Sequence, residues 1–241
     1  MPEVLLIVLL TSAAGACIPV GGLLASLEHI QPNWLEEELR HFVIALGGGI
    51  LLGAVAVVLV PEGMTALGQA YWGIPLLLAG GIVCFAIERS MGLRRRQAPQ
   101  LMGMLLDYVP EAVALGGMLA VDARLAPLLA VLIALQNLPE GFNAYRELTP
   151  LNGNSRARTL GMMCALVLLG PLAGVLGYLF LAAYPAVLGA GMLIAAGGIL
   201  YLVFQDIAPQ SRLDKHWGPP LGAVIGFSIA VFGDMLTRHF G

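Results

Sequence analysis

Residues 127–147, PLLAVLIALQNLPEGFNAYRE, combine an apolar run with a proline and an acidic side chain near its middle. The run is long enough to cross the hydrocarbon core of a bilayer, which takes about 20 helical residues. Its central triplet is Pro139-Glu140-Gly141. A similar triplet, Pro110-Glu111-Ala112, lies near the middle of another apolar run, and Pro61-Glu62-Gly63 closes a third. The sequence therefore predicts several membrane helices that each carry a carboxylate.

An acidic side chain inside a membrane segment indicates a function. Insertion into hydrocarbon costs about 2.5–3.5 kcal/mol per acidic residue at a helix centre, so such groups usually face a polar interior. Each proline lacks an N–H and frees the carbonyl one turn earlier, here that of Val57, Leu106 or Leu135. Carboxylates beside freed carbonyls are suited to replacing the water around a cation.

The composition favours an all-α integral membrane protein. Hydrophobic residues make up 59% of the chain and charged residues 11%, and the mean hydropathy is +0.86. A soluble domain of 241 residues cannot bury that much apolar surface. The 31 glycines predict close helix packing, and the net charge of −3 is too small to indicate a nucleic-acid partner.

We expect one transmembrane domain over residues 1–241, with eight transmembrane helices. Their approximate ranges are 4–26, 41–63, 73–90, 100–121, 127–147, 159–183, 187–209 and 219–237. We expect the first range to be a retained helix rather than a secretion signal, since a signal would begin with Lys or Arg and this stretch begins Met1-Pro2-Glu3.

The basic residues predict the orientation of the helices. Ten of the 12 lie in the first, third, fifth and seventh loops: Arg40, Arg89, Arg94, Arg95, Arg96, Arg146, Arg156, Arg158, Arg212 and Lys215. Only Arg124 and Arg238 lie on the other side. The positive-inside rule places the basic loops in the cytoplasm and both termini outside it. The run Arg94–Arg96 is interpreted as a topology signal that contacts anionic lipid.

A short internal repeat accompanies this pattern. Gly48-Gly49-Ile50-Leu51 precedes Pro61, and Gly197-Gly198-Ile199-Leu200 precedes Pro209 at nearly the same distance. The two helices concerned run in opposite directions, so the repeat suggests two halves of inverted orientation. Coincidence in a glycine-rich chain is the alternative.

Polar side chains gather on the fourth and fifth predicted helices. Asp107 and Glu111 share one helix face, and Gln136, Asn137 and Glu140 form a similar cluster. These five are the predicted metal ligands, and Met104, Glu62 and Asp206 are predicted to lie along the pathway of the ion. A lone buried carboxylate could merely hold helices together, but three of them without a Lys, Arg or His in the membrane core require protons or an external cation.

Other site types are disfavoured. The four histidines, His29, His41, His216 and His239, lie near helix ends or in loops, so a histidine-based zinc hydrolase is not expected. Single cysteines in separate apolar segments indicate no metal or redox site. The core has no nucleophile–base pair, so we expect neither an enzyme nor an organic cofactor.

At these residues the chain resembles the ZIP (Zrt-/Irt-like) family of divalent metal transporters. The family's fourth helix carries His-Asn-x-Pro-Glu-Gly, where this chain has Asp107-Tyr108-Val109-Pro110-Glu111-Ala112. Its fifth helix carries a similar motif, which Gln136-Asn137-Leu138-Pro139-Glu140-Gly141 fits well. The family's seventh helix ends in an acidic pair and Pro-Glu, whereas this one ends Gln205-Asp206-Ile207-Ala208-Pro209-Gln210. The resemblance implies eight helices in a 3+2+3 arrangement with inverted repeats.

Several departures concern a second metal. The family's sixth-helix glutamate falls at Gly170, and a second-helix ligand position falls near Ile50 and Leu51. The His-rich third loop is also missing. The site implied is rich in oxygen, which suits Mn²⁺ or Fe²⁺ and also accepts Zn²⁺.

Two hypotheses of different class follow. The first is a carrier in the plasma (inner) membrane that moves zinc, iron or manganese toward the cytoplasm by sliding one helix set, with the second, fourth, fifth and seventh helices among it, past the other. The second is a non-transporting membrane scaffold or metal sensor with the same fold. The expected partners are the metal ion as substrate and membrane lipid, and a homodimer is one of the assembly states left open.

Overall fold

The computed structural model describes residues 2–27, 33–68, 70–91, 99–121, 123–181, 183–213 and 217–240, and within these ranges it is helical without a strand. The basic residues Arg94, Arg95, Arg96 and Lys215 lie outside them. The α-helices are α1 (Pro2–Leu27), α2 (Asn33–Ala54), α3 (Val60–Leu67), α4 (Ala70–Met91), α5 (Pro99–Val121), α6 (Ala126–Leu151), α7 (Arg156–Leu166), α8 (Leu169–Leu181), α9 (Pro185–Leu202), α10 (Ala208–Gln210) and α11 (Pro219–Phe240).

Seven stretches in the described part of the chain are long and apolar enough to cross a membrane. They are Glu3–Leu27, Glu38–Leu67, Tyr71–Ser90, Gly103–Ala120, Arg156–Leu181, Pro185–Gln210 and Pro219–His239. An all-α membrane protein is thereby supported. The helix α6 is not among the seven, although it is 26 residues long. Its buried Gln136, Asn137, Glu140 and Asn143 lower its mean hydropathy.

Two π-helices interrupt the longest helical stretches. The π-helix η1 (Val55–Leu59) joins α2 to α3, and η3 (Val203–Ile207) joins α9 to α10. Each ends two residues before a proline, Pro61 or Pro209. Proline cannot donate the next helical hydrogen bond and its ring clashes with the preceding turn, so the extra residue of a π-helix relieves the conflict. The internal repeat seen in the sequence thus has a structural counterpart.

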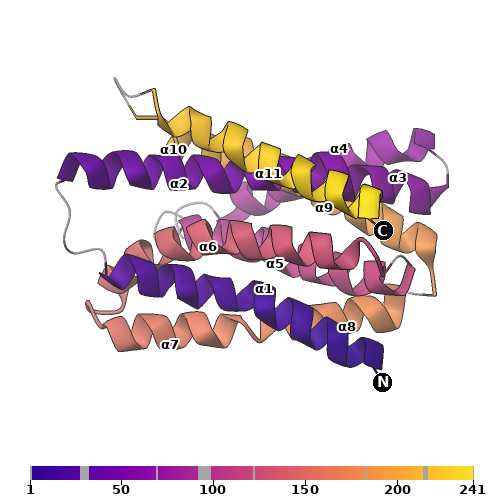
Figure 1. Cartoon of the computed structure of the whole chain (residues 1–241), viewed down its shortest axis with the longest axis horizontal. Helices are drawn as coiled ribbons and strands as arrows, with labels where there is room; N and C mark the ends of the chain where they lie inside the picture. The colour runs from indigo at the N-terminus through magenta and orange to yellow at the C-terminus, as the bar shows by residue number, and fades with distance from the viewer. Residues whose placement is uncertain are drawn as a thin grey trace.

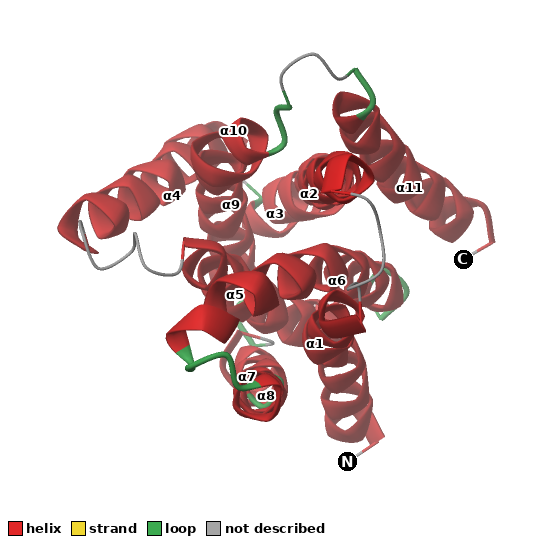
Figure 2. Ribbon diagram, turned by 90° about the vertical axis from the view of Figure 1, so that its left-hand side faces the viewer, coloured by secondary structure: helices red, strands yellow, loops and turns green. Residues whose placement is uncertain are grey.

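The helices form three rows, which are seen end-on in Figure 2. One outer row holds α4, α9, α2 and α11, the middle row holds α5 and α6, and the other outer row holds α8 and α1. The packing is regular: α1 contacts α6 as α8 contacts α5, and α2 contacts α11 as α9 contacts α4. Both termini lie at the same end of the bundle (Figure 1).

Close backbone contacts at glycines sort the helices into two groups. A Cβ atom at Gly141 would lie 2.2 Å from the carbonyl oxygen of Ile18, which joins α6 to α1, and one at Gly116 would lie 1.9 Å from that of Gly174, which joins α5 to α8. In the other group, Gly49 joins α2 to Ala223 of α11, and Gly197 joins α9 to Leu77 of α4.

Contacts between the two groups are of a different kind. At the described glycines they meet side chains rather than backbone, as where Gly47 of α2 faces the ring of Pro139 on α6 and Gly117 of α5 faces Leu188 of α9. We call α1, α5, α6, α7 and α8 the first group, and α2, α3, α4, α9 and α11 the second. Backbone packs against backbone inside each group, and side chains separate the groups.

Replacing glycine by alanine should affect the melting temperature differently at two positions. Gly116→Ala places a methyl group against the backbone of α8 and should lower the melting temperature in detergent. Gly191→Ala on α9, where an added Cβ meets nothing within 4 Å, should leave it unchanged or raise it, since alanine favours a helix by about 0.5–1 kcal/mol over glycine. Equal effects in a thermal unfolding assay would contradict this packing.

Candidate metal centre

Two hydrogen bonds fix how α5 and α6 align. The Nε2 atom of Gln136 donates to Oε2 of Glu111 at 2.5 Å, and the backbone N–H of Leu101 donates to Oε2 of Glu147 at 3.4 Å. The helices therefore run antiparallel. In this register Asp107 lies opposite Glu140.

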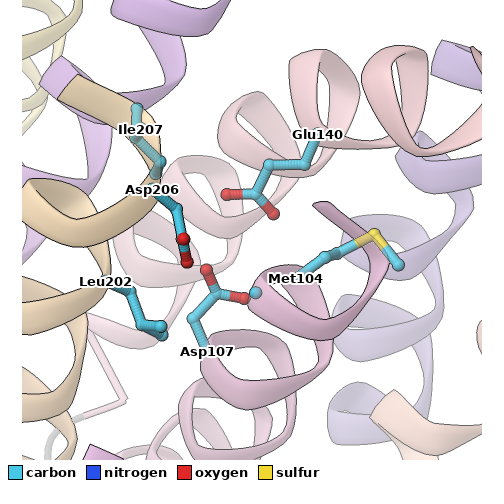
Figure 3. A pocket seen from close by; sticks show the side chains of 7 residues that line it. Met104, Asp107, Glu140, Leu202, Asp206 and Ile207 are labelled. Carbon is cyan, nitrogen blue, oxygen red and sulfur yellow. The ribbon is translucent and has the colours of Figure 1, made fainter. Parts of the chain in front are cut away.

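A small pocket of about 20 Å³, which is room for about one water molecule, lies beside the Asp107–Glu140 pair. Its lining comes from α5, α6, α9 and η3: Gly103, Met104, Asp107, Glu140, Leu202, Asp206 and Ile207. Figure 3 shows the carboxyl groups of Asp107, Glu140 and Asp206 turned toward one another, while the sulfur of Met104 points away from them. The pocket thus brings one acidic side chain from each of three helical segments together.

The carboxylates of the centre are buried and repel one another. Asp107, Glu111 and Glu140 are 3%, 0% and 7% exposed. The charge of Asp107 is opposed by those of both Glu111 and Glu140. Among the described residues, the other buried polar side chains are Thr11, Ser26, Gln136, Asn137, Asn143 and Thr159, so none is cationic. Within the described part of the chain, no buried cationic side chain balances these charges.

Buried oxygens without a hydrogen-bond partner concentrate here. They are Oδ1 of Asp107, Oε1 of Glu111, Oε1 of Gln136, Oδ1 of Asn137, Oε1 and Oε2 of Glu140, and Oδ1 of Asn143. Unpaired buried polar atoms are rare in folded proteins, and each costs about 1–3 kcal/mol. An oxygen-only set of acceptors is what a cation would satisfy.

The structure brings together only part of the predicted ligand set. Asp107 and Glu140 line the pocket, while Glu111 and Gln136 pair with each other one helical turn away. Asn137 turns to α1, where its Nδ2 donates to the carbonyl of Ala14 at 3.0 Å. The pocket lining does not include it.

Of the three predicted pathway residues, two line the pocket and one does not. Met104 and Asp206 both line the pocket, so Asp206 lies beside two of the predicted ligands, Asp107 and Glu140. Glu62 on α3 instead lies close enough to Arg238 of α11 for their charges to interact, and Arg238 also pairs with Asp234 at 2.9 Å. Glu62 takes no part in the central pocket.

Tyr108 fills the space next to the centre. Its hydroxyl donates to the carbonyls of Thr11 and Val167, both at 3.4 Å, and Cβ atoms at Gly15 and Gly170 would lie about 2 Å from it. Val167 stands four residues before Pro171, which has no N–H for it. The tyrosine therefore occupies the place that the missing side chain of Gly170 leaves open.

Sequence reasoning missed Asn143. It is 4% exposed, its Oδ1 has no hydrogen-bond partner, and it lies on α6 three residues after Glu140, on the same helix face. That spacing was the available signal. The role of Tyr108 in filling the gap at Gly170 could not be read from two residues 62 positions apart in the sequence.

The carboxylates of the centre are too far apart to bind one metal ion together. Within the described residues, no three His, Cys, Asp or Glu side chains are grouped closely enough to hold a metal ion. A cation in the pocket would have to draw the carboxylates together or keep part of its water shell. The chain matches no known family model, and a search of curated proteins found no similar protein.

Removing the hydroxyl of Tyr108 should weaken the helix packing and leave the pocket intact. Tyr108→Phe deletes two long hydrogen bonds, so unfolding should become easier by about 1 kcal/mol. Cation binding should not change, because Tyr108 does not line the pocket. Thermal unfolding in detergent measures the first effect, with the exposed Tyr184→Phe as control. A loss of cation binding without a loss of stability would show that the hydroxyl belongs to the site.

Proposed function

We propose that this protein carries a divalent transition-metal cation, zinc, iron or manganese, across a membrane, in the manner of the ZIP family that it resembles. The observation that carries the proposal is the convergence of Asp107, Glu140 and Asp206 on one pocket. Of these three, Asp107 and Glu140 are buried, and no cationic side chain is among the buried polar residues that the structure describes, so their charges require protons or an external cation. A divalent cation supplies the missing charge and satisfies several of the unpaired oxygens at once.

In this proposal α6 also crosses the membrane, which brings the number of membrane helices from seven to eight. It lies in the middle row beside α5 (Figure 2), and its polar side chains Gln136, Asn137, Glu140 and Asn143 are buried inside the protein. The paired contacts favour an inverted repeat, since α1 on α6 corresponds to α8 on α5, and α2 on α11 to α9 on α4. The placing of η1 and η3 before Pro61 and Pro209 supports the same relation. Along the chain the order is then 3+2+3, with three membrane helices before α5 and α6 and three after them.

The packing of the two helix groups supports movement. Asp107 and Glu140 belong to the first group, and Asp206 belongs to the segment that continues α9 in the second. Sliding one group along the other would separate Asp206 from its two neighbours and weaken the hold on a cation. The sequence placed the second, fourth, fifth and seventh helices in one moving set, whereas the glycine contacts group α5 and α6 with α1 and α8.

The distribution of basic residues supports an orientation of the helices in the membrane. Basic residues such as Arg89, Arg146, Arg156 and Arg212 favour the cytoplasm for the loops that join the helices at the end opposite the termini. Both termini then face the outside of a plasma or inner membrane, and movement of the metal toward the cytoplasm is what the resemblance to the ZIP family implies. Lipid contacts the outer helices, of which α4 and α11 expose many apolar side chains.

Uptake by purified protein in liposomes tests the proposal. A dye trapped inside should report entrance of Zn²⁺, Fe²⁺ or Mn²⁺ with the wild-type protein and none with empty vesicles. Binding of these metals without uptake would identify the protein as a scaffold or metal sensor instead. Neither binding nor uptake at millimolar metal would refute both functions.

Two glutamates should differ in their contribution. Glu140→Gln keeps the size of the side chain but removes a charge from the pocket, so uptake and metal-dependent stabilisation should fall markedly. Glu62→Gln changes a carboxylate near Arg238, outside the pocket, and should reduce uptake less. Initial rates in liposomes and melting temperatures with and without metal measure both effects. Equal losses in the two variants would overturn the central position of Glu140.

One cation per chain should occupy the centre. Two divalent ions carry four positive charges, more than the three carboxylates that line the pocket can balance, and close cations need shared ligands to overcome their repulsion. The fourth carboxylate, Glu111, lies one turn away and accepts a hydrogen bond from Gln136. Tyr108 fills the neighbouring space at Gly170, so no further ligand lies there. Anomalous scattering from a metal-soaked crystal should show a single central peak, and two fully occupied peaks would contradict this stoichiometry.

A further inference from the structure

The facing sides of α5 and α6 carry further pairs of polar or sulfur-containing side chains beyond the Asp107–Glu140 pair in the pocket. The bonds Gln136–Glu111 and Leu101–Glu147 set a register in which residue numbers of facing positions add to 247 or 248. The same register places Met104 opposite Asn143. These pairs, from Glu111–Gln136 through Asp107–Glu140 and Met104–Asn143 to Leu101–Glu147, follow one another at intervals of about 5 Å along the helices. We call them the α5–α6 polar row.

The Met104–Asn143 level has the features of a ligand position. Both side chains are buried, at 1% and 4% exposure, and Oδ1 of Asn143 has no hydrogen-bond partner. Met104 lines the pocket together with Asp107 and Glu140, yet its sulfur points away from their carboxyl groups (Figure 3). The thioether is therefore directed to a position that a cation would reach only after leaving the carboxylates.

We propose that Met104 and Asn143 form a second, weaker binding position for the transported cation, on its way from the central pocket to the end of the bundle where α6 terminates. This inference rests on the proposed carrier function and deepens it. The position has no formal charge, so it holds a cation less tightly than the carboxylates and suits release. The row then leads to Glu147, close to the basic end that the proposed orientation places in the cytoplasm.

The sulfur also gives the position a preference among metals. A thioether is a soft ligand and favours softer cations, whereas the amide oxygen of Asn143 accepts hard and soft ions alike. Cd²⁺ as a soft probe and Mn²⁺ as a harder one should therefore respond differently to changes at the two residues. A role in packing alone would affect both ions equally.

The experiment compares initial uptake of Cd²⁺ and Mn²⁺ in liposomes for five proteins: wild type, Met104→Leu, Met118→Leu, Asn143→Leu and Asn143→Asp. Met118 is the matched control, since it is buried on the same helix at 2% exposure and lies outside the polar row. Met104→Leu should lower Cd²⁺ uptake several-fold and Mn²⁺ uptake much less. Asn143→Leu should lower both rates, and Asn143→Asp, which keeps an oxygen, should restore them in part.

The outcomes separate this inference from the function on which it rests. Wild-type uptake that is unchanged by both Met104→Leu and Asn143→Leu would overturn the second position and leave the carrier function standing. An equal loss for the two metals in Met104→Leu, or the same loss in Met118→Leu, would reduce Met104 to a packing residue and also overturn the proposal. Absence of wild-type uptake of Cd²⁺ and Mn²⁺, and also of Zn²⁺ and Fe²⁺ in the same liposomes, would overturn the carrier and the second position together.

Discussion

The alignment of α5 with α6 is the constraint on which the centre depends. The hydrogen bond from Gln136 to Glu111 holds the two middle helices in one register, and that register sets which other side chains face each other. A shift by one residue would turn Glu140 by about 100° around its helix and away from Asp107. Because α5 and α6 have protein on both sides, their polar faces can remain inside the bundle (Figure 2).

Backbone contact at glycine is what keeps the outer helices close enough to enclose this centre. Lipid tails supply little hydrophobic drive for helix association, so van der Waals contact between backbones has to supply it. Gly116 against Gly174 and Gly141 against Ile18 hold the helices next to α5 and α6, and Gly49 and Gly197 do the same in the opposite row. The acidic pocket lies where this backbone contact gives way to side chains.

Much of the fold and part of the site could be predicted from the sequence. Apolar runs and prolines located most helix ends within a few residues, although α2 begins at Asn33 rather than near residue 41. The carboxylates after Pro110 and Pro139 are buried as expected. The position of Asp206 was harder to predict. An α-helical wheel assumes a constant turn, whereas the π-helix Val203–Ile207 adds a residue and changes which face of the following turn meets the pocket. The same uncertainty applies wherever a helix is wound irregularly.

Tertiary contact decided the remaining positions. The spacing of Asn143 from Glu140 puts it on the same helix face, but only the packed structure shows that it is buried and that its Oδ1 has no hydrogen-bond partner. Tyr108 has meaning only beside Gly15 and Gly170, which contribute space rather than chemistry. Spacing along one helix can therefore identify the charges of a membrane site, but the number of cations it can hold depends on the volume that distant small residues leave open or that a large side chain fills.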